Sequence, residues 1–391
     1  MGVETDGEAR DGAVWALGLM SGTSLDGVDA SLILTDGERI LDTGPSLYEP
    51  YDADTLPALS HVMAEPAAFR DGTMPGAAEV LGEAAREVVR VHARAAAALI
   101  ADAPAARAPA VVGFPGQTVL HAPERGLTWQ IGDGAALARA LGRAVVWDFR
   151  TDDVAAGGQG APLAPFFHWA AMRSAGLAEP VAVLNIGGVA NVTWVDPRAG
   201  DPTAPGALVA FDTGPGNALV NDWMAEHDGR AMDAGGGVAA AGRAARARLA
   251  QRLRTNTVAD HLGRPPPKSL DRNAFNALPR LLEGESVEDG AAALTGLTVD
   301  CAAAALDHLP TPPARWLVCG GGRYNATMMA WLAEALDGAV EPIEAVGLDG
   351  DMLEAQAFGF LAVRVLRGMA TSGPSTTGAA RAVSGGRVAT P

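Results

Sequence analysis

The sequence predicts an α/β protein of two lobes, and three observations support this fold class. The chain has 391 residues, which suits two domains of roughly 100–200 residues each. A pattern of apolar strand, small polar turn and apolar strand occurs at residues 14–34 and again at residues 180–195. Helical segments alternate with further short strands, as in mixed α/β folds. We therefore expect an ancient duplication, with two similar lobes around one cleft.

The first lobe is predicted to continue with alternating helices and strands. Apolar residues at helical spacing predict one long helix within 76–103. A short buried strand within 109–118 is expected to end in a Pro-Gly turn. The segment 133–142 predicts a helix that starts near its aspartate and ends before its glycine. The strand at 143–149 then leads into a polar, glycine-rich loop at 150–165, where ligands of open α/β folds usually bind.

The second lobe is predicted to place two more glycine turns at the ends of strands. Residues 208–223 indicate a strand, a glycine turn and a helix, and residues 315–336 indicate a strand, a glycine triplet and a helix from near Asn325. The segment 353–370 predicts an amphipathic helix, which we expect to pack back on the first lobe. We expect a flexible segment at 1–13, a first lobe at 14–179 and a second lobe at 180–391. The small polar residues from Thr371 onward favour partial disorder.

Composition excludes several classes of protein and site. The formal net charge of −17 disfavours nucleic acid and anionic membranes as partners, and no apolar run approaches the ~20 residues of a membrane span. Two cysteines, with an acidic segment at 1–12 that lacks the features of a signal peptide, favour a reducing cytoplasm. Lys268 is the only lysine, and no G-x-x-x-x-G-K-[ST] occurs. Any ATP site must therefore use backbone amides, hydroxyls and magnesium-binding carboxylates.

The glycine turns together predict a nucleotide site, although each alone is equally typical of a plain turn. Asp26 in the first turn suits magnesium bound to a polyphosphate, or it caps its own turn. Asp29 leaves the same two interpretations open. Asp212 follows an apolar strand and precedes glycines, which favours a general base over a turn cap. Glu354 lies at the start of a predicted helix, and its position alone favours a structural role as a partner of the helix dipole.

Three other residues favour structural roles. His121 and His168 are isolated histidines with no neighbouring ligands at zinc-binding spacing. Lys268 follows "RPPP", and we expect it to be an exposed loop lysine.

Eight motifs in order resemble the anhydro-N-acetylmuramic acid kinase family. They are "GLMSGTSLDGVDA", "QIGDGAALA", "DFRTDDVAAGGQGAPLAP", "LNIGGVANVT", "FDTGPGNALVNDW", "PKSLDRNAFN", "VCGGGRYN" and "LEAQAFGFLA". The resemblance spans about residue 15 to the C-terminus and includes the polar tail, which favours an ordered tail. It implies the fold of actin and sugar kinases. It also implies a reaction in which 1,6-anhydro-N-acetylmuramic acid, ATP and water give N-acetylmuramic acid 6-phosphate and ADP, in cell-wall recycling.

The resemblance also implies the site residues. The catalytic pair is Asp212 as the base and Glu354 in the sugar site. Magnesium is expected at Asp26, directly or through water. The expected ATP contacts are Gly22, Thr23, Ser24, Leu25, Asp26, Gly27, Val28, Asp29, Asn185, Gly187, Gly188, Gly320, Gly321 and Gly322. The expected sugar contacts are Gln117, Thr118, Asp148, Arg150, Gly214 and Asn217.

One departure from the family pattern leaves alternatives open. The family has His-Gly-Gln-Thr where this chain reads Pro115-Gly-Gln-Thr, and proline donates neither a hydrogen bond nor a proton. A non-catalytic sugar- or nucleotide-binding protein therefore stays as an alternative to the kinase. An actin-like ATPase of the same fold is a second alternative, independent of Pro115. The expected partners are ATP and the anhydro sugar, without nucleic acid or membrane, and a homodimer is left open.

Overall fold

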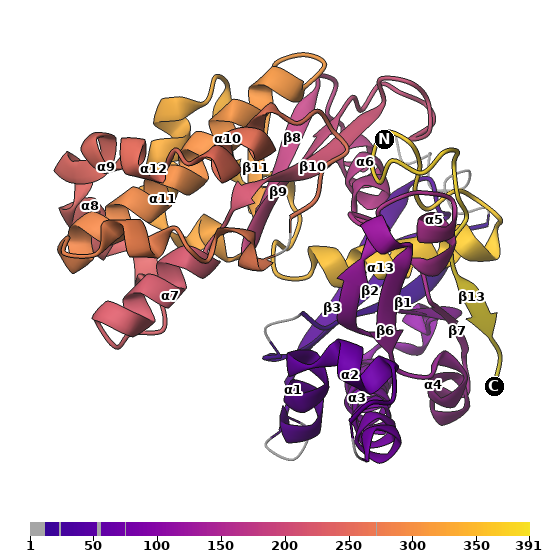
Figure 1. Cartoon of the computed structure of the whole chain (residues 1–391). Helices are drawn as coiled ribbons and strands as arrows, with labels where there is room; N and C mark the ends of the chain where they lie inside the picture. Colours follow the sequence, from indigo (N-terminus) through magenta and orange to yellow (C-terminus); the bar gives the residue numbers. More distant parts are fainter. Residues whose placement is uncertain (1–11, 23–24, 53–55, 75, 271) are drawn as a thin grey trace. The chain divides into compact units, whose positions relative to one another are not determined.

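The computed structural model describes residues 12–22, 25–52, 56–74, 76–270 and 272–391. The chain forms two compact units. The first takes in the described residues up to Ser174 and those from Met352 onward, and the second comprises Ala175–Asp351. The predicted α/β class with two lobes is confirmed, because each unit holds its own mixed sheet covered by helices (Figure 1).

The first unit is built on a six-stranded sheet in the order β13-β7-β4-β1-β2-β3, with a two-stranded sheet β5-β6 beside it. Its strands are β1 Val14–Met20, β2 Gly27–Thr35, β3 Ile40–Pro50, β4 Val111–Phe114, β5 Gln117–Ala122, β6 Leu127–Ile131, β7 Ala144–Trp147 and β13 Arg387–Ala389. Its helices are α1 Leu56–Ala64, α2 Pro66–Arg70, α3 Ala77–Asp102, α4 Gly134–Leu141, α5 Thr151–Ala155, α6 Pro165–Ser174 and α13 Leu353–Leu366.

The second unit is built on a five-stranded sheet in the order β10-β9-β8-β11-β12. Its strands are β8 Val181–Ile186, β9 Val189–Val195, β10 Leu208–Pro215, β11 Arg315–Cys319 and β12 Ala339–Pro342. Its helices are α7 Ala218–His227, α8 Gly237–Ala241, α9 Arg246–Leu253, α10 Asn256–Gly263, α11 Val287–Ala304 and α12 Ala326–Ala335.

The two sheets repeat one topology, which confirms the predicted duplication. In the first unit β3-β2-β1 pair antiparallel, and β4 and β7 then follow β1 in parallel. In the second unit β10-β9-β8 pair antiparallel, and β11 and β12 follow β8 in parallel. Each unit therefore presents a glycine turn at the same point, between its first two strands.

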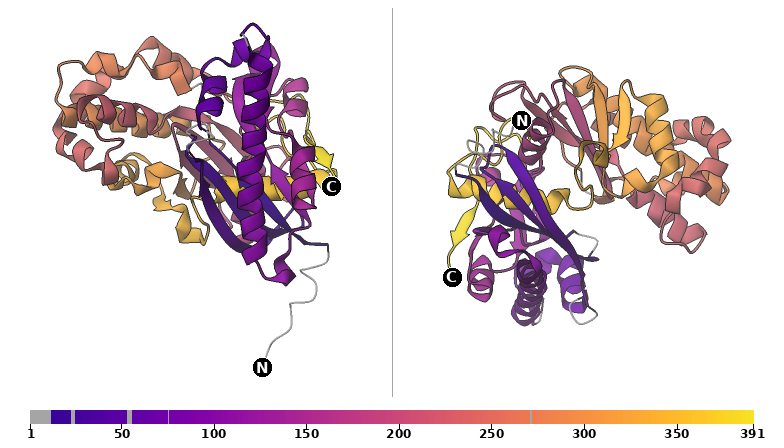
Figure 2. Two further views of the ribbon diagram at one scale, coloured as in Figure 1. Left: turned by 90° about the horizontal axis from the view of Figure 1, so that it is seen from below. Right: turned by 180° about the vertical axis from the view of Figure 1, so that it is seen from behind.

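Helices cover both faces of the first sheet. Leu17 and Leu19 on one face of β1 belong to the core that includes Val88 and Val91 of α3. Gly18 faces the other way, where a Cβ would meet the carbonyl oxygen of Ala355 in α13 at 1.7 Å. Only a glycine lets the first turn of α13 lie this close to β1. Figure 2 shows α13 on the face of the first sheet opposite the long helix α3.

Two predicted features of the first unit are wrong in detail. The segment 353–370 was predicted to be amphipathic, but nearly every residue of α13 from Leu353 to Arg364 is buried, because β1, β2, β4 and α6 surround it. The loop predicted at 150–165 begins with the short helix α5. Its start, Arg150, lies beyond the end of β7, as the sequence indicated.

The polar tail is ordered by a buried carboxylate. Asp153 accepts hydrogen bonds from the backbone N–H of Gly160 at 2.6 Å and the hydroxyl of Thr377 at 2.6 Å, and it also contacts the hydroxyl of Ser372. The chain then adds β13 to the sheet edge at β7. The expectation of partial disorder from Thr371 onward is therefore wrong, because composition does not reveal this distant partner.

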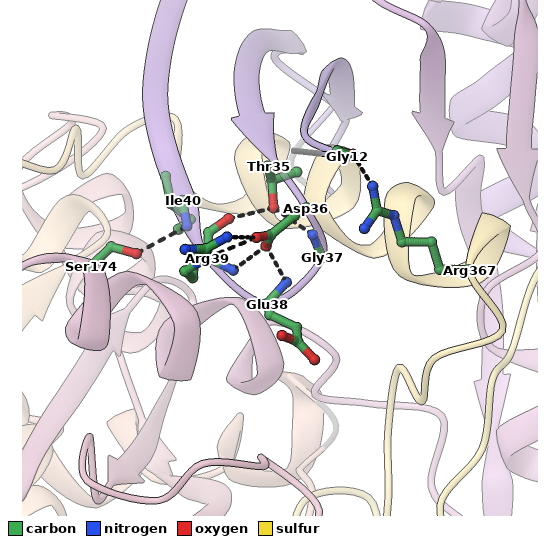
Figure 3. A network of polar contacts seen from close by, with 9 residues as sticks. All are labelled: Gly12, Thr35, Asp36, Gly37, Glu38, Arg39, Ile40, Ser174 and Arg367. Carbon is green, nitrogen blue, oxygen red and sulfur yellow. Dashed lines mark hydrogen bonds and ion pairs between the residues drawn. The ribbon is translucent and has the colours of Figure 1, made fainter. Parts of the chain in front are cut away.

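A second polar network closes the hairpin between β2 and β3 (Figure 3). The carboxylate of Asp36 accepts from the backbone N–H of Glu38 and Arg39 at 2.9 and 2.7 Å and pairs with the Arg39 guanidinium. The hydroxyl of Ser174, at the end of α6, accepts a hydrogen bond from the Ile40 N–H at 2.9 Å. Arg367, just after α13, donates to the carbonyl oxygen of Gly12. These contacts lie at one end of the first three strands, where Val14 pairs with Thr35 and Thr35 pairs with Ile40.

The described helices include no segment that meets the length and hydropathy needed to span a bilayer.

Candidate functional site

Three glycine turns of the second unit meet at the ends of its strands. The backbone N–H groups of Gly216 and Asn217 donate to the carbonyl oxygens of Gly188 and Gly187 at 3.0 and 2.7 Å. The side-chain amide of Asn217 donates to the carbonyl oxygen of Ile186 at 3.0 Å. The turn after β8 and the turn before α7 are therefore held together, which places the predicted residues Asn185, Gly187, Gly188, Gly214 and Asn217 in one region.

The glycine triplet after β11 joins this region. Gly320 has a φ of +70°, and a Cβ there would lie 2.4 Å from Oδ1 of Asn185 and 2.7 Å from the carbonyl oxygen of Ile186. A Cβ on Gly321 would lie 3.4 Å from the side-chain amide nitrogen of Asn217. The helix α12 then begins after Asn325, whose side chain accepts from the N–H of Met328, as the sequence predicted. These turns offer closely spaced backbone groups of the kind that approach a phosphate or a nucleoside.

Asp212 lies within β10 rather than after it, which corrects the predicted strand end. A register shift against β9 between Asp212 and Gly214 marks a bulge, and bulges re-aim side chains. The backbone N–H of Asp212 donates to the carbonyl oxygen of Lys268 at 2.9 Å. Its Oδ2 accepts from the backbone N–H of Leu270 at 2.7 Å.

The surroundings of Asp212 suit a base that works near neutral pH. The side chain is half-buried and densely surrounded by protein atoms, and this desolvation raises its pKa to about 7, against the lowering effect of the hydrogen bond from Leu270. In the described part of the chain, Oδ1 has no hydrogen-bond donor. One carboxylate oxygen is thus held in place while the other is open to accept a proton.

Sequence reasoning missed the residues that hold Asp212. The ring Nε2 of His261 bonds the carbonyl oxygen of Asp212 at 2.8 Å, and Leu270 and Lys268 bond its carboxylate and its N–H. Lys268 is buried, with 3% of its surface exposed, so the expectation of an exposed lysine is wrong. The "PKSL" motif was the one available signal, but nothing in its spacing connects it to Asp212.

The first unit holds the predicted hairpin turn between β1 and β2. Thr23 and Ser24 lie outside the described residues. Leu25 has a φ of 57°, and the exposed Asp26 accepts from the N–H of Gly27 at 3.1 Å. Gly22 lies before the turn, and Gly27, Val28 and Asp29 begin β2.

Gln117 braces this turn. It is fully buried, accepts from the Ser21 hydroxyl at 2.7 Å and donates to the carbonyl oxygen of Gly22 at 3.2 Å. Thr118, its neighbour in β5, accepts from the amide of Gln130 at 3.3 Å. The sequence predicts sugar contacts at both positions. The structure adds that Gln117 joins β5 to the turn between β1 and β2.

Arg150 lies just beyond the end of β7, and its positive charge acts on Glu354 in the first turn of α13. The Arg150 guanidinium donates to the carbonyl oxygen of Gly160 at 2.7 Å. Desolvation raises the pKa of the Glu354 carboxyl, and the nearby Arg150 opposes that shift. Asp148, with a φ of 55°, accepts from the hydroxyl of Thr151 at 2.5 Å and from Arg387 at 2.7 Å. Asp148 therefore ties α5 and β13 to the end of β7.

Pro115 lines a hollow of about 160 Å³ in the first unit. The other residues that line it are Gly116, Thr128, Trp129, Gln130, Gly132, Trp147, Asp148 and Thr151. Indole rings, an amide, a hydroxyl and a carboxylate are the groups that commonly contact a sugar. The position that departs from the family pattern thus faces a space that also includes Asp148, a predicted sugar contact.

The described residues include no group of three or more His, Cys, Asp or Glu side chains arranged to hold a metal ion. Both cysteines, Cys301 and Cys319, are free and buried.

Comparison with known proteins identifies the family. The sequence model of the anhydro-N-acetylmuramic acid kinases matches residues 14–391. The chain belongs to the anhydro-N-acetylmuramic acid kinase family. An anhydro-N-acetylmuramic acid kinase of Rhodospirillum rubrum is 52% identical over 378 residues, which cover 96% of this chain and 94% of the relative. One of Cereibacter sphaeroides is 52% identical over 384 residues, covering 98% of each.

The anhydro-N-acetylmuramic acid kinase family was expected to share the fold of actin and sugar kinases. The α/β class, the two units and the repeated sheet agree with that expectation. Among solved structures, the (R)-2-hydroxyglutaryl-CoA dehydratase component A of Acidaminococcus fermentans covers 90% of this chain and 98% of its own, at 12% identity and a TM-score of 0.43.

Proposed function

We propose that this chain is an ATP-dependent kinase that opens the 1,6-anhydro bond of 1,6-anhydro-N-acetylmuramic acid and phosphorylates O6. The products are N-acetylmuramic acid 6-phosphate and ADP. One observation carries the proposal: Asp212, in a chain that matches the family over residues 14–391, combines a pKa of about 7 with a carboxylate oxygen that no described residue donates to. A general base with a pKa near the working pH is suited to take a proton from water.

The anhydro bridge joins C1 to O6, so its opening and the phosphorylation are coupled. Asp212 takes a proton from a water molecule, and the water oxygen forms a bond to C1. The C1–O6 bond breaks, and its electron pair stays on O6. That oxygen then attacks the γ-phosphorus of ATP, and ADP leaves. No covalent intermediate with the enzyme is needed, because water supplies the oxygen that replaces O6 at C1.

Backbone groups replace the missing phosphate-loop lysine in this proposal. In the first unit, we propose phosphate contacts in the turn from Gly22 to Asp29. In the second unit, we propose phosphate contacts in the turn from Asn185 to Gly188 and nucleoside contacts at Gly320–Gly322. Magnesium would be held by Asp26. Desolvation raises the pKa of Tyr48, and the charges of Asp26 and Asp29 both add to that rise, so the two carboxylates act on one location. Hard carboxylate ligands suit Mg²⁺, which neutralises phosphate charge when it is bound.

Glu354 and Arg150 are proposed to orient the sugar. Their opposite charges act on each other near the start of α13, and close packing of that helix on β1 limits its movement. The hollow at Pro115 supplies the aromatic and polar contacts. A cytoplasmic location in cell-wall recycling agrees with a substrate released by turnover of the wall and with Cys301 and Cys319, which are both free.

An assay of ADP release with and without the anhydro sugar tests the proposal. We expect ADP to appear only when ATP, Mg²⁺ and 1,6-anhydro-N-acetylmuramic acid are all present. N-acetylmuramic acid, which lacks the anhydro bridge, is the matched control and should not be phosphorylated. ATP hydrolysis that is independent of the sugar, with a rise in light scattering, would instead indicate an actin-like ATPase. Binding of both ligands without ADP release would indicate a binding protein.

A further inference from the structure

Lys268, the single lysine of the chain, is buried beside the segment that holds Asp212. Its ammonium group donates to the carbonyl oxygens of His261 and Leu262 at 3.0 and 3.2 Å. Both carbonyls belong to the last turn of α10, where four backbone oxygens lack partners within the helix and the helix dipole favours a cation. Nζ also lies 5.2 Å from the ring centroid of Phe211. The buried charge is therefore satisfied by a helix end and an aromatic face.

Asp212 is held both by the backbone of residues 268–270 and by the ring of His261. The carbonyl oxygen of Lys268 accepts the Asp212 N–H, and two residues later the Leu270 N–H donates to the Asp212 carboxylate. His261, whose carbonyl binds the ammonium, contacts the Asp212 carbonyl through its ring. A carbonyl oxygen only accepts, so Nε2 of His261 carries the proton. One side chain thus connects the end of α10 to the segment that bonds the Asp212 carboxylate.

We infer that Lys268 is a positioning residue that holds the Leu270 N–H against the carboxylate of Asp212. The inference rests on the proposed role of Asp212 as the base. Lys268 itself has no contact with the Asp212 carboxylate, because its ammonium is directed to the end of α10. Its effect on the reaction passes through the backbone of residues 268–270 and through His261. Loss of the ammonium should release this segment and leave Asp212 less precisely aimed.

The loss should also change the proton affinity of Asp212. The hydrogen bond from Leu270 lowers the pKa of Asp212, so weakening that bond should raise the pKa further. The titratable and charged groups around this corner are Asp212, His261, Arg264, Lys268, Cys301 and His308. Burial lowers the pKa of His261 to about 4 and, with Arg264, that of Lys268 to about 8. All of these groups except Lys268 are unchanged in Lys268→Met and Lys268→Arg.

The test compares Lys268→Met with Lys268→Arg in the full chain. Methionine keeps the length and apolar contacts, whereas arginine also keeps a cation that can donate to two carbonyls. We expect Lys268→Met to lower kcat by about 10- to 100-fold, with little change in KM for ATP and the sugar. The acidic limb of its kcat–pH profile should move to higher pH. Lys268→Arg should recover much of kcat and restore the limb.

Two further measurements make the outcomes decisive. Thermal unfolding of each variant reports the folded fraction, and a kcat loss that only follows unfolding, with an unmoved acidic limb, would overturn the inference. Unchanged kcat in Lys268→Met would overturn it as well. The double variant Asp212→Asn with Lys268→Met should be no slower than Asp212→Asn alone, because Lys268 acts through Asp212. Normal turnover in Asp212→Asn would instead refute the proposed base, a result distinct from failure of the lysine inference.

Discussion

At the scale of single residues, the chemistry depends on what surrounds Asp212. A carboxylate in water would be fully ionised at neutral pH and a weak base. Here desolvation raises its pKa to about 7, while the Leu270 N–H holds one oxygen. The residue type and its place near glycines were evident in the sequence. The bulge was not evident, because it depends on how β10 pairs with β9. The bonds from residues 268–270 were not evident either, because they join segments more than fifty residues apart.

Asp212→Asn should retain binding of ATP and sugar and lose turnover. Asparagine keeps the shape and can still accept from the Leu270 N–H, but it takes up no proton. Removal of a general base typically costs about 10²–10⁴-fold in kcat. Asp260→Asn, an exposed change in the neighbouring helix α10, is the control and should behave as the parent. Near-normal turnover of Asp212→Asn would assign the base to another group, with Glu354 the first candidate.

The pH dependence of the enzyme should report the raised pKa of Asp212. Only the ionised carboxylate accepts a proton, so kcat should fall as pH drops below about 7. Stability should show the opposite trend. The folded-state pKa lies above the unfolded value near 4, so this group lowers stability progressively as pH rises from about 4 to about 7. Asp212→Asn should therefore unfold at higher temperature than the parent at about pH 8, and equally at about pH 4.

Pro115→His should improve sugar binding. The position lines the hollow that also includes Asp148 and Gln130, and an imidazole there adds a polar contact that proline cannot make. One such contact contributes roughly 0.5–1.5 kcal/mol, so KM for the sugar should fall by about 2- to 10-fold with little change in kcat. Pro115→Ala removes the proline without adding an imidazole and should not lower KM. Equal KM values for all three proteins would show that the hollow does not contact the sugar.

At the scale of elements, the three glycine turns of the second unit form one surface because their strands are neighbours. Short apolar runs beside glycines predicted β8, β10 and β11, and the structure confirms them. What the sequence could not predict is how closely the turns pack, since this depends on strand order. The same limit explains α13, whose apolar residues suggested one buried face although neighbours cover it nearly all round.

Gly320→Ala should weaken ATP binding through this close packing. The added Cβ would meet Oδ1 of Asn185 at 2.4 Å, so the turn after β8 must shift. We expect KM for ATP to rise by at least ~10-fold, equivalent to about 1.4 kcal/mol. Gly229→Ala is the matched control: its φ is +72°, nearly that of Gly320, but a Cβ there meets nothing within 4 Å. If Gly320→Ala and Gly229→Ala show the same KM for ATP, the close approach of Gly320 to Asn185 does not explain a change in KM. The backbone strain that both substitutions share would then explain it.

At the scale of the whole molecule, one sheet topology is used twice, and the chain returns to the first unit after completing the second. The repeated strand–turn–strand pattern was enough to predict the duplication. The return at Met352 depends on the fit of α13 against Gly18 and on the partners of the tail, such as Asp153. Composition and periodicity do not reveal contacts of that kind, which form between residues hundreds of positions apart.

Reaction in ¹⁸O-labelled water tests the coupled mechanism most directly. If water attacks C1 while O6 attacks the γ-phosphorus, one ¹⁸O atom should enter the anomeric hydroxyl of the product and none should enter its phosphate. A single-turnover reaction, quenched before the anomeric oxygen exchanges with solvent, allows both positions to be measured by mass spectrometry and ³¹P NMR. The account predicts label at C1 only; ¹⁸O in the phosphate group, or an unlabelled anomeric oxygen, would contradict it.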